Sequence, residues 1–277
     1  MELYKKNALE ISKITTRNYS TSFSLGTRML TPHYRQGIYA IYGFVRFADE
    51  IVDTFHEYDK QMLIRDFRRQ TNEAIQYGIS TNPILHSFQW AVNRYGIDQE
   101  LIDAFLDSME MDLNHRIYDS QKIKQYIYGS AEVVGLMCLR VFYDGDDENY
   151  QKLKYPARKL GEAFQKVNFL RDMKDDFYDK GRVYFPDVDF RSFNDQVKKE
   201  IEQDIAHDFN EAFHGIVMLK PAARFGVYLA YRYYLQLFKK IQRTHAENVM
   251  QKRYRVSNWM KMVLLFKSFV RNTTSLF

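Results

Sequence analysis

The chain has 277 residues, of which 45% are hydrophobic, 16% aromatic and 27% charged, and its net charge is +5 with a pI near 9.0. This length and composition fit one globular domain over residues 1–277, and the single cysteine, Cys138, excludes an intrachain disulfide framework and a thiolate metal site. The start of the chain has no apolar signal segment, and no run of about 18 apolar residues occurs, so we expect a cytoplasmic location. The positive charge suits an anionic substrate or membrane surface, whereas nucleic acid is not expected because no recognisable binding module accompanies the charge.

Apolar residues recur at helical spacing through most of the chain, and no repeat or Pro/Gly-rich linker divides it. Thr31-Pro32 predicts the start of a helix over about 32–54, because proline is favoured at the first helical position. Turn residues indicate breaks at 96–98, 119–120 and 144–146. The remaining expected helices are at about 149–178, 192–216, 219–247 and 255–271, with a loop at 184–186. The fold class expected is therefore all-α, a bundle of many helices.

Two pairs of aspartates, Asp49 with Asp53 and Asp172 with Asp176, are each spaced four residues apart within an expected helix. This spacing places both carboxylates of a pair on one helix face, about one turn apart. Gathering like charges is unfavourable unless a cation lies between them, and Mg²⁺ takes oxygen ligands from a few carboxylates together with substrate phosphates. The pairs therefore indicate divalent cations that hold a diphosphate.

Other polar residues share a face with each aspartate pair. At 100° per residue, Tyr42 and Arg46 lie within an arc of about 60° with the first pair, and Gln165 and Asn168 lie within about 80° with the second. The alternative interpretation is that both faces are solvated and hold ordinary ion pairs, and for either pair alone this alternative is the stronger. Arg46 beside one pair and Arg171 beside the other favour a metal–diphosphate site, because arginine binds phosphate oxygens bidentately.

Such a site suits the ionisation of an allylic diphosphate. Mg²⁺ stabilises the leaving diphosphate, and the allylic carbocation left behind needs a dry pocket with aromatic faces. The chain has 21 Phe and 21 Tyr that could line this pocket, although core filling is the alternative role for each ring. The candidate rings are Phe23, Tyr42, Tyr128, Phe164 and Tyr234.

The stretch Leu160–Asp172 (LGEAFQKVNFLRD), continued through Asp176 to residues 182–186 (RVYFP), closely resembles a signature of the squalene and phytoene synthase family. Further resemblances stand at residues 19–24 (YSTSFS), 40–53, 128–135 and 253–257 (RYRVS), so the resemblance spans about residues 10–260. Ile127 and Glu132 depart from the family pattern, because they stand where its middle motif usually has small residues.

The resemblance implies an isoprenoid-synthase-type helical bundle with a central active-site cavity. It implies the head-to-head condensation of two geranylgeranyl diphosphates to phytoene through cyclopropyl prephytoene diphosphate, the first committed step of carotenoid biosynthesis. Mg²⁺, or Mn²⁺ in its place, would be required and NADPH would not. The alternatives are conversion of farnesyl diphosphate to dehydrosqualene or squalene, and a non-catalytic prenyl-lipid-binding protein. Besides prenyl diphosphates, a membrane surface and downstream carotenoid enzymes are possible partners.

The same resemblance implies the site residues. The metal ligands would be Asp49, Asp53, Asn168, Asp172 and Asp176. The four aspartates would be catalytic, together with Tyr42 and Arg171. The residues that would contact or position substrate are Tyr19, Ser20, Thr21, Ser22, Arg46, Tyr128, Gln165, Asn168, Arg182, Tyr184, Tyr234 and Arg253. Asp112 resembles a family position that faces the cavity, and a paired helix aspartate is the alternative.

Towards the C-terminus, basic residues interleave with large apolar ones. The basic residues are Lys252, Arg253, Arg255, Lys261, Lys267 and Arg271, and the apolar ones are Trp259, Met260 and residues 262–266. This pattern is typical of a helix that contacts a membrane surface. The alternative, which the pattern alone favours, is a terminal helix that packs one side on the body of the protein.

Overall fold

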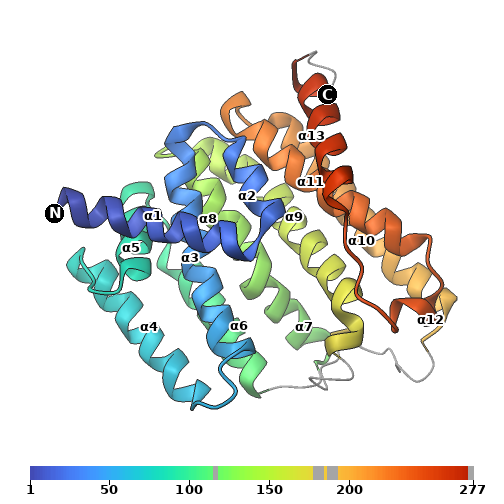
Figure 1. Cartoon of the computed structure of the whole chain (residues 1–277), viewed down its shortest axis with the longest axis horizontal. Coiled ribbons are helices and arrows are strands. Elements are labelled where there is room, and N and C mark those ends of the chain that lie inside the picture. Colours follow the sequence, from blue (N-terminus) through green and yellow to red (C-terminus); the bar gives the residue numbers. More distant parts are fainter. Residues whose placement is uncertain (115–117, 177–183, 186–192, 274–277) are drawn as a thin grey trace.

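The computed structural model describes residues 1–114, 118–176, 184–185 and 193–273, and every regular element within these ranges is a helix (Figure 1). The expected all-α class is therefore confirmed. The elements are, in chain order, α1 (Glu2–Tyr19), α2 (Thr21–Arg28), α3 (Pro32–Asp53), α4 (Lys60–Tyr77), α5 (Pro83–Tyr95), α6 (Gln99–Asn114), α7 (Ser120–Ile127), the π-helix η1 (Tyr128–Glu132), α8 (Val133–Phe142), α9 (Asp147–Lys174), α10 (Asp195–Met218), α11 (Pro221–Gln242), α12 (Ala246–Val249) and α13 (Asn258–Thr273).

Two helices carry the aspartate pairs, and both begin close to where the sequence places them. Helix α3 has Pro32 at its first position, as predicted. Helix α9 begins at Asp147, two residues before the predicted start, because the Asp146 carboxylate accepts a hydrogen bond from the Asn149 N–H at 3.2 Å. Past Lys174 the chain continues as a π turn at Asp175 and Asp176, so the second aspartate pair lies at the end of this helix.

The helix predicted over 219–247 is wrong at its C-terminal end. Helix α11 ends at Gln242, and the short helix α12 begins anew at Ala246. Asp195, at the start of α10, accepts a hydrogen bond from the Ala246 N–H at 2.7 Å and pairs with the His245 ring at 2.9 Å. This cap comes from a residue 51 positions away in the chain, so periodicity along α11 does not reveal it.

The two larger hydrophobic cores of the described residues have a gap between them, and two smaller clusters accompany them. The first core lies among α3, α5, α6 and α8, where Phe44 is fully buried and stacks on Phe88 with ring centroids 3.8 Å apart. The second core lies among α9, α10, α11 and α12. Rings such as Phe44 fill a core rather than line a pocket, and truncating one to alanine costs about 3–5 kcal/mol. These cores fix α3 and α9 as opposite walls of the gap.

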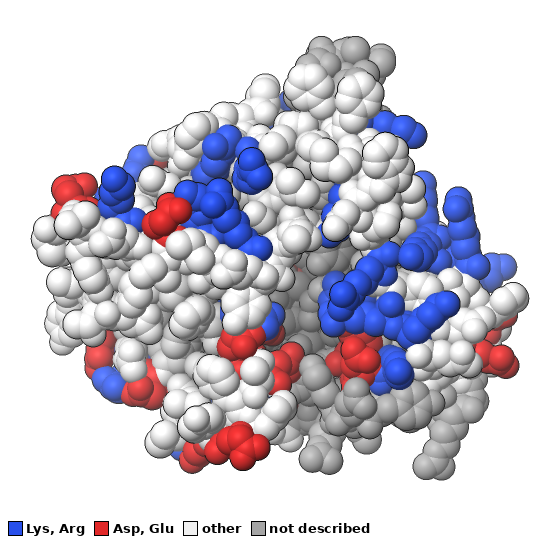
Figure 2. Space-filling model, in the orientation of Figure 1, with Lys and Arg blue, Asp and Glu red and all other residues white. Residues whose placement is uncertain are grey.

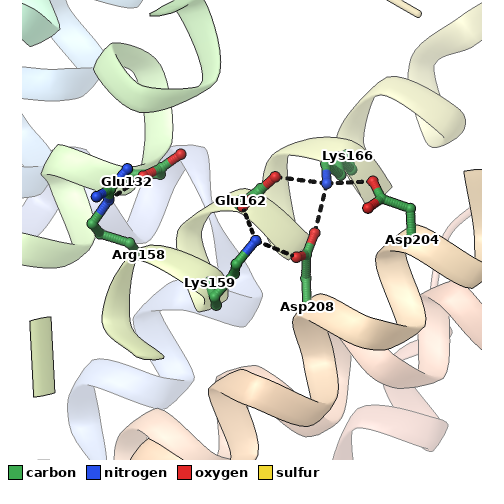
Figure 3. Close-up of polar contacts among 7 residues, drawn as sticks. All are labelled: Glu132, Arg158, Lys159, Glu162, Lys166, Asp204 and Asp208. Carbon is green, nitrogen blue, oxygen red and sulfur yellow. Dashed lines mark hydrogen bonds and ion pairs between the residues drawn. The ribbon is translucent and has the colours of Figure 1, made fainter. Parts of the chain in front are cut away.

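The side of α9 that faces away from the gap is held on α10 by buried ion pairs (Figure 3). The Asp208 carboxylate is fully buried and accepts hydrogen bonds from Lys159 Nζ at 2.8 Å and from Lys166 Nζ at 2.7 Å. Glu162 pairs with the same two lysines, each at 2.7 Å, and Lys166 also pairs with Asp204. Because charges buried in this way need partners, the network fixes the rotation of α9 about its axis.

Candidate active site

A cavity of about 420 Å³ lies between the two larger cores. The surface of the molecule has a hollow near its centre (Figure 2). This volume lies within the range of pockets that bind small molecules. One end is apolar and is lined by Leu30, Phe142 and Leu219. Six polar residues of the wall lie towards the other end, on α3, α9 and α11. They are Tyr42, Arg46, Asp49, Gln165, Asn168 and Tyr234. Thr27, Tyr126 and Ser130 are further polar residues of the wall.

On the α3 wall, Arg46 organises the polar groups. Its Nη1 donates to Asp49 Oδ2 at 2.6 Å, its Nη2 pairs with Glu50, and its guanidinium lies 4.3 Å from the ring of Tyr19. Asp53 lies one turn beyond Asp49, is half-buried and does not line the cavity. The sequence analysis missed Glu50, although its spacing of four residues from Arg46 is a signal for this ion pair.

On the α9 wall, Gln165 and Asn168 line the cavity and Asp172 follows one turn later. The Asp172 carboxylate accepts hydrogen bonds from Arg171 at 2.9 and 2.5 Å and pairs with Arg253 Nε at 2.7 Å. The contact with Arg253 joins two motifs that are 81 positions apart in the chain. Asp176 lies a turn further on and is buried.

Three buried polar atoms along this cavity have no hydrogen-bond partner among the residues that the structure describes. They are Arg46 Nε, Asn168 Oδ1 and Ser130 Oγ, and all three residues line the cavity. A buried polar group that is left unpaired costs about 1–3 kcal/mol. An arginine N–H can donate only and an amide oxygen can accept only, so the two walls offer one site to an anion and one to a cation or a donor.

The oxygen donors on the two walls fit Mg²⁺, which prefers carboxylate and phosphate oxygens. Among the residues that the structure describes, no three acidic, histidine or cysteine side chains converge closely enough to hold a metal ion by themselves. The aspartates are instead held by arginines, Asp49 by Arg46 and Asp172 by Arg171 and Arg253. The donor set is therefore one in which a bound diphosphate would supply the remaining metal ligands.

Aromatic side chains cover the polar end of the cavity. Tyr42 stacks on Phe23 with ring centroids 4.7 Å apart, and Tyr234 stacks on Phe164 at 3.9 Å. All four rings line the cavity. Burial raises the pKa of Tyr42 to about 12, so its phenol stays protonated at neutral pH and can donate a hydrogen bond.

The hydroxyl residues before and within α2 lie beside the cavity rather than in its wall. Ser20 caps α2, where its Oγ accepts a hydrogen bond from the Phe23 N–H at 3.2 Å, and Thr21 Oγ1 accepts one from Lys261 Nζ at 2.7 Å. Tyr19, Ser20, Thr21 and Ser22 do not line the cavity. Two of them contact residues of the cavity wall, Tyr19 through the guanidinium of Arg46 and Ser20 through a hydrogen bond with Tyr42.

Tyr126, which stands two residues before the middle motif, lines the cavity, whereas the predicted substrate contact was Tyr128. Tyr126 lines the cavity and donates to Asp112 Oδ2 at 2.8 Å, while Tyr128 lies 5.2 Å from the guanidinium of Arg158 and does not line the cavity. Burial, together with the negative charge of Asp112, raises the pKa of Tyr126 well above its usual value. The spacing of Tyr126 four residues before Ser130 could have indicated the shared face.

Asp112 is a paired aspartate that accepts hydrogen bonds from three phenols. Besides Tyr126, Tyr118 donates to it at 2.9 Å and Tyr184 at 3.2 Å. Tyr184, a predicted substrate contact, is therefore directed to Asp112 and does not line the cavity. Arg182 lies outside the residues that the structure describes.

The departure at Glu132 is accommodated by charge pairing. Glu132 is buried, and its carboxylate accepts a hydrogen bond from Arg158 Nε at 2.5 Å. Burial raises the pKa of Glu132 despite the hydrogen bond from Arg158, which acts in the opposite direction. The helices cross closely here. A Cβ added at Gly161 would lie only 2.7 Å from the Ala131 carbonyl oxygen. The middle motif therefore keeps its close contact with α9.

Comparison with known proteins identifies the family. Residues 16–260 match the family described as squalene/phytoene synthase. The chain belongs to this family. It is 28% identical over 286 aligned residues to phytoene synthase from Arthrospira platensis, an alignment that covers 94% of this chain and 92% of the relative. It is 29% identical to 4,4'-diapophytoene synthase from Staphylococcus haemolyticus, over 69% of this chain and 67% of the relative.

Solved structures of related synthases share the fold. A dehydrosqualene synthase superposes with a TM-score of 0.82 at 21% identity, covering 98% of both chains. A squalene synthase from Alicyclobacillus acidocaldarius superposes with a TM-score of 0.76 at 18% identity, covering 91% of this chain and 97% of that one. The isoprenoid-synthase-type helical bundle is therefore confirmed.

As a member of the squalene/phytoene synthase family, the chain is a synthase of the prenyltransferase type, as expected. Six of the predicted site residues line one cavity, and Asp172 lies beyond its wall, where it contacts Arg253. Over the described ranges, none of the helices combines the length and the apolar character needed to cross a bilayer.

Proposed function

We propose that this synthase condenses two molecules of geranylgeranyl diphosphate head-to-head into phytoene, through prephytoene diphosphate, in a Mg²⁺-dependent reaction. The observation that carries the proposal is the pair of orphaned atoms, Arg46 Nε and Asn168 Oδ1, at the polar end of a mostly apolar cavity. A diphosphate with its counter-ion would satisfy both atoms, and the apolar remainder suits a prenyl chain.

In the proposed reaction, bound Mg²⁺ supplies Lewis-acid stabilisation of the departing diphosphate. Asp49, Asp53, Asp172, Asp176 and Asn168 are the residues that would hold it. The arginines that hold the aspartates in the structure, Arg46, Arg171 and Arg253, would turn to the diphosphate oxygens, which guanidinium groups bind bidentately.

The rings around the polar end would protect the carbocation. The protonated phenol of Tyr42 can donate a hydrogen bond to the diphosphate, and Phe23, Phe164 and Tyr234 present apolar ring faces to the cavity. Such faces exclude water and attract a cation through their quadrupoles. Tyr126, held by Asp112, offers a further phenol to the same space.

The length of the cavity supports a long prenyl chain. Along α9, the residues that line the cavity run from Leu153 to Asn168, a rise of 15 residues that spans about 22 Å at 1.5 Å per residue. The alternative substrate is farnesyl diphosphate, giving dehydrosqualene or squalene. The similarity to a diapophytoene synthase and to the structure of a dehydrosqualene synthase favours this alternative.

An assay with purified protein separates these proposals. The protein is incubated with labelled geranylgeranyl or farnesyl diphosphate, with Mg²⁺ or EDTA, and with or without NADPH, and both diphosphate release and the hydrocarbon product are measured. We expect phytoene from geranylgeranyl diphosphate, with Mg²⁺ and without NADPH. If diphosphate is released from farnesyl diphosphate alone, the product is dehydrosqualene or squalene and not phytoene. If a substrate binds but neither substrate releases diphosphate, the chain is a non-catalytic prenyl-lipid-binding protein.

We further propose that the enzyme acts in the cytoplasm as a single domain over residues 1–277 and passes its product to downstream carotenoid enzymes at a membrane surface. The support for this location is chemical, because a hydrocarbon product of this size partitions out of water. Co-sedimentation of the product with added lipid vesicles during turnover tests it.

A further inference from the structure

Helix α13 carries a stripe of large apolar side chains that face solvent. The four side chains and their exposed fractions are Trp259 at 77%, Met262 at 53%, Phe266 at 70% and Phe269 at 53%. Their spacing of three, four and three residues places them within an arc of about 80° on the helix. Leu264, on the opposite side, is buried against α11, so the stripe points away from the body of the protein.

The helix that carries the stripe is fixed to the body of the protein. The Tyr233 hydroxyl of α11 donates to the Lys261 carbonyl oxygen at 3.1 Å, and Lys261 Nζ donates to Thr21 Oγ1 of α2 at 2.7 Å. Near the other end, the rings of Phe225 and Phe269 lie 6.1 Å apart. The stripe therefore belongs to a helix that is packed on the body of the protein, and Trp259, Met262 and Phe266 remain mostly exposed on it.

Positive charge gathers around the start of α13. Figure 2 shows Lys and Arg side chains clustered beside the central hollow, over the segment that leads into this helix. The exposed basic residues at this end are Lys239, Lys240, Lys252, Arg253 and Arg255, and Lys267 is exposed further along the helix. Lys240 Nζ donates to the Arg255 carbonyl oxygen at 2.9 Å, which joins the end of α11 to this segment. Basic groups beside exposed Trp and Phe complement anionic lipid headgroups over an acyl boundary.

We propose that α13 docks the enzyme on an anionic lipid bilayer, with the stripe at the acyl boundary and the basic cluster on the headgroups. The choice of a bilayer over another apolar partner rests on the proposed function, because the proposed product is a hydrocarbon. The position of the helix suits this role. Arg253, which contacts Asp172 at the polar end of the site, precedes the first residue of α13 by five positions, so docking would hold that end close to the bilayer.

Vesicle sedimentation with two matched double variants tests the proposal. Vesicles of phosphatidylcholine with 30% phosphatidylglycerol, and vesicles of phosphatidylcholine alone, are spun down with the full chain. We expect the wild type to bind the anionic vesicles, and Trp259→Ser/Phe266→Ser to lower the partition coefficient at least about tenfold. Tyr58→Ser/Tyr77→Ser is the control, because it removes two rings that are each 69% exposed at the ends of α4, and it should bind as the wild type does.

A fluorescence measurement locates the contact. The chain has two tryptophans, so a Trp90→Phe variant leaves Trp259 as the only one. We expect its emission to shift to the blue on anionic vesicles and to be quenched by brominated lipid. Binding without quenching would overturn the placement of the stripe at the acyl boundary.

The docking proposal and the proposed function fail separately. Diphosphate release in detergent solution is measured for each variant, and we expect the stripe variant to keep wild-type turnover, because neither of its substituted residues lines the cavity. Equal sedimentation of the wild type and the stripe variant would overturn the docking surface whatever the activity. Light scattering provides a second test. A wild-type dimer that dissociates when the stripe is substituted would also overturn the docking surface, because the stripe would then contact a second copy of the chain.

Discussion

Replacement of Asn168 by leucine tests whether the polar end of the cavity is built for a ligand at the expense of stability. Asn168 Oδ1 is buried without a hydrogen-bond partner in the described part of the chain, which costs about 1–3 kcal/mol. Its Nδ2 makes one long hydrogen bond, to Gln165 Oε1 at 3.3 Å, worth at most about 1 kcal/mol. Leucine has a similar shape and no polar atoms. We therefore expect the free energy of unfolding without ligand to rise by about 1–2 kcal/mol, and Tm to rise by about 2–8 °C.

Activity should change in the opposite direction. If Asn168 contributes an oxygen to the bound metal–diphosphate, the leucine variant loses a ligand that a neighbouring side chain does not replace. We expect kcat/KM for diphosphate release to fall about 100-fold or more. Thermal unfolding is followed by circular dichroism, alone and with Mg²⁺ plus inorganic diphosphate. The wild type should gain Tm with these ligands and the variant should not.

Asn149→Leu provides the control on the same helix. The Asn149 amide donates to the Asp146 carboxylate at 2.9 and 3.2 Å, so its polar atoms are already used. We expect this variant to lose about 1 kcal/mol of stability and to keep its activity. If Tm falls as much for Asn168→Leu as for Asn149→Leu, the claim that Asn168 Oδ1 is unpaired is refuted. If Mg²⁺ plus diphosphate still raises the Tm of Asn168→Leu, the role of Asn168 as a ligand is refuted.

Three other substitutions test the metal site and the packing of α9. Asp172→Asn should lower turnover about 100-fold and raise the Mg²⁺ concentration at half-maximal rate, and an unchanged Mg²⁺ titration would contradict its role, with Asp175→Asn as the matched control. Asp208→Asn removes a buried charge partner from Lys166, which is buried, and from Lys159, which is partly buried. Urea unfolding should therefore show a loss of about 3–5 kcal/mol, and a loss under 1 kcal/mol would count against the network. Gly161→Ala places a Cβ 2.7 Å from the Ala131 carbonyl oxygen and should lower both Tm and turnover, whereas a wild-type Tm would show that α9 can shift without cost.

Local chemistry made much of the fold predictable. Thr31-Pro32 marks the start of α3 because proline suits the first helical turn, and the long apolar periodicity of α9 survives the proline at position 156. The end of α11 was not predictable, because the competing cap is a long-range contact from Asp195. The ion-pair alternative was also partly right. Arg46 does pair with Asp49, but it does so at a partly buried cavity wall rather than on a solvated face.

The site was predictable where the helices are regular. On α9, the 100° spacing correctly placed Gln165 and Asn168 together, and both line the cavity. In the middle of the chain, Tyr126 and Ser130 are four residues apart and both line the cavity, whereas Tyr128 stands two residues from each and does not. Unpaired atoms such as Asn168 Oδ1 depend on every neighbour in space, so no pattern along the chain reveals them.

The arginine–aspartate pairs explain how two acidic walls can be stable before any ligand binds. Asp172 is shared by Arg171 and Arg253, and Asp49 is held by Arg46, so the repulsion within each aspartate pair is offset inside the protein. In the proposed reaction the carboxylates would hold Mg²⁺ and the guanidinium groups would bind the diphosphate. Each charged side chain would then exchange one partner for another, and none would be left buried without a partner. Because metal without diphosphate would leave the arginines unpaired, Mg²⁺ and diphosphate should bind cooperatively, each raising the affinity of the other by the same factor.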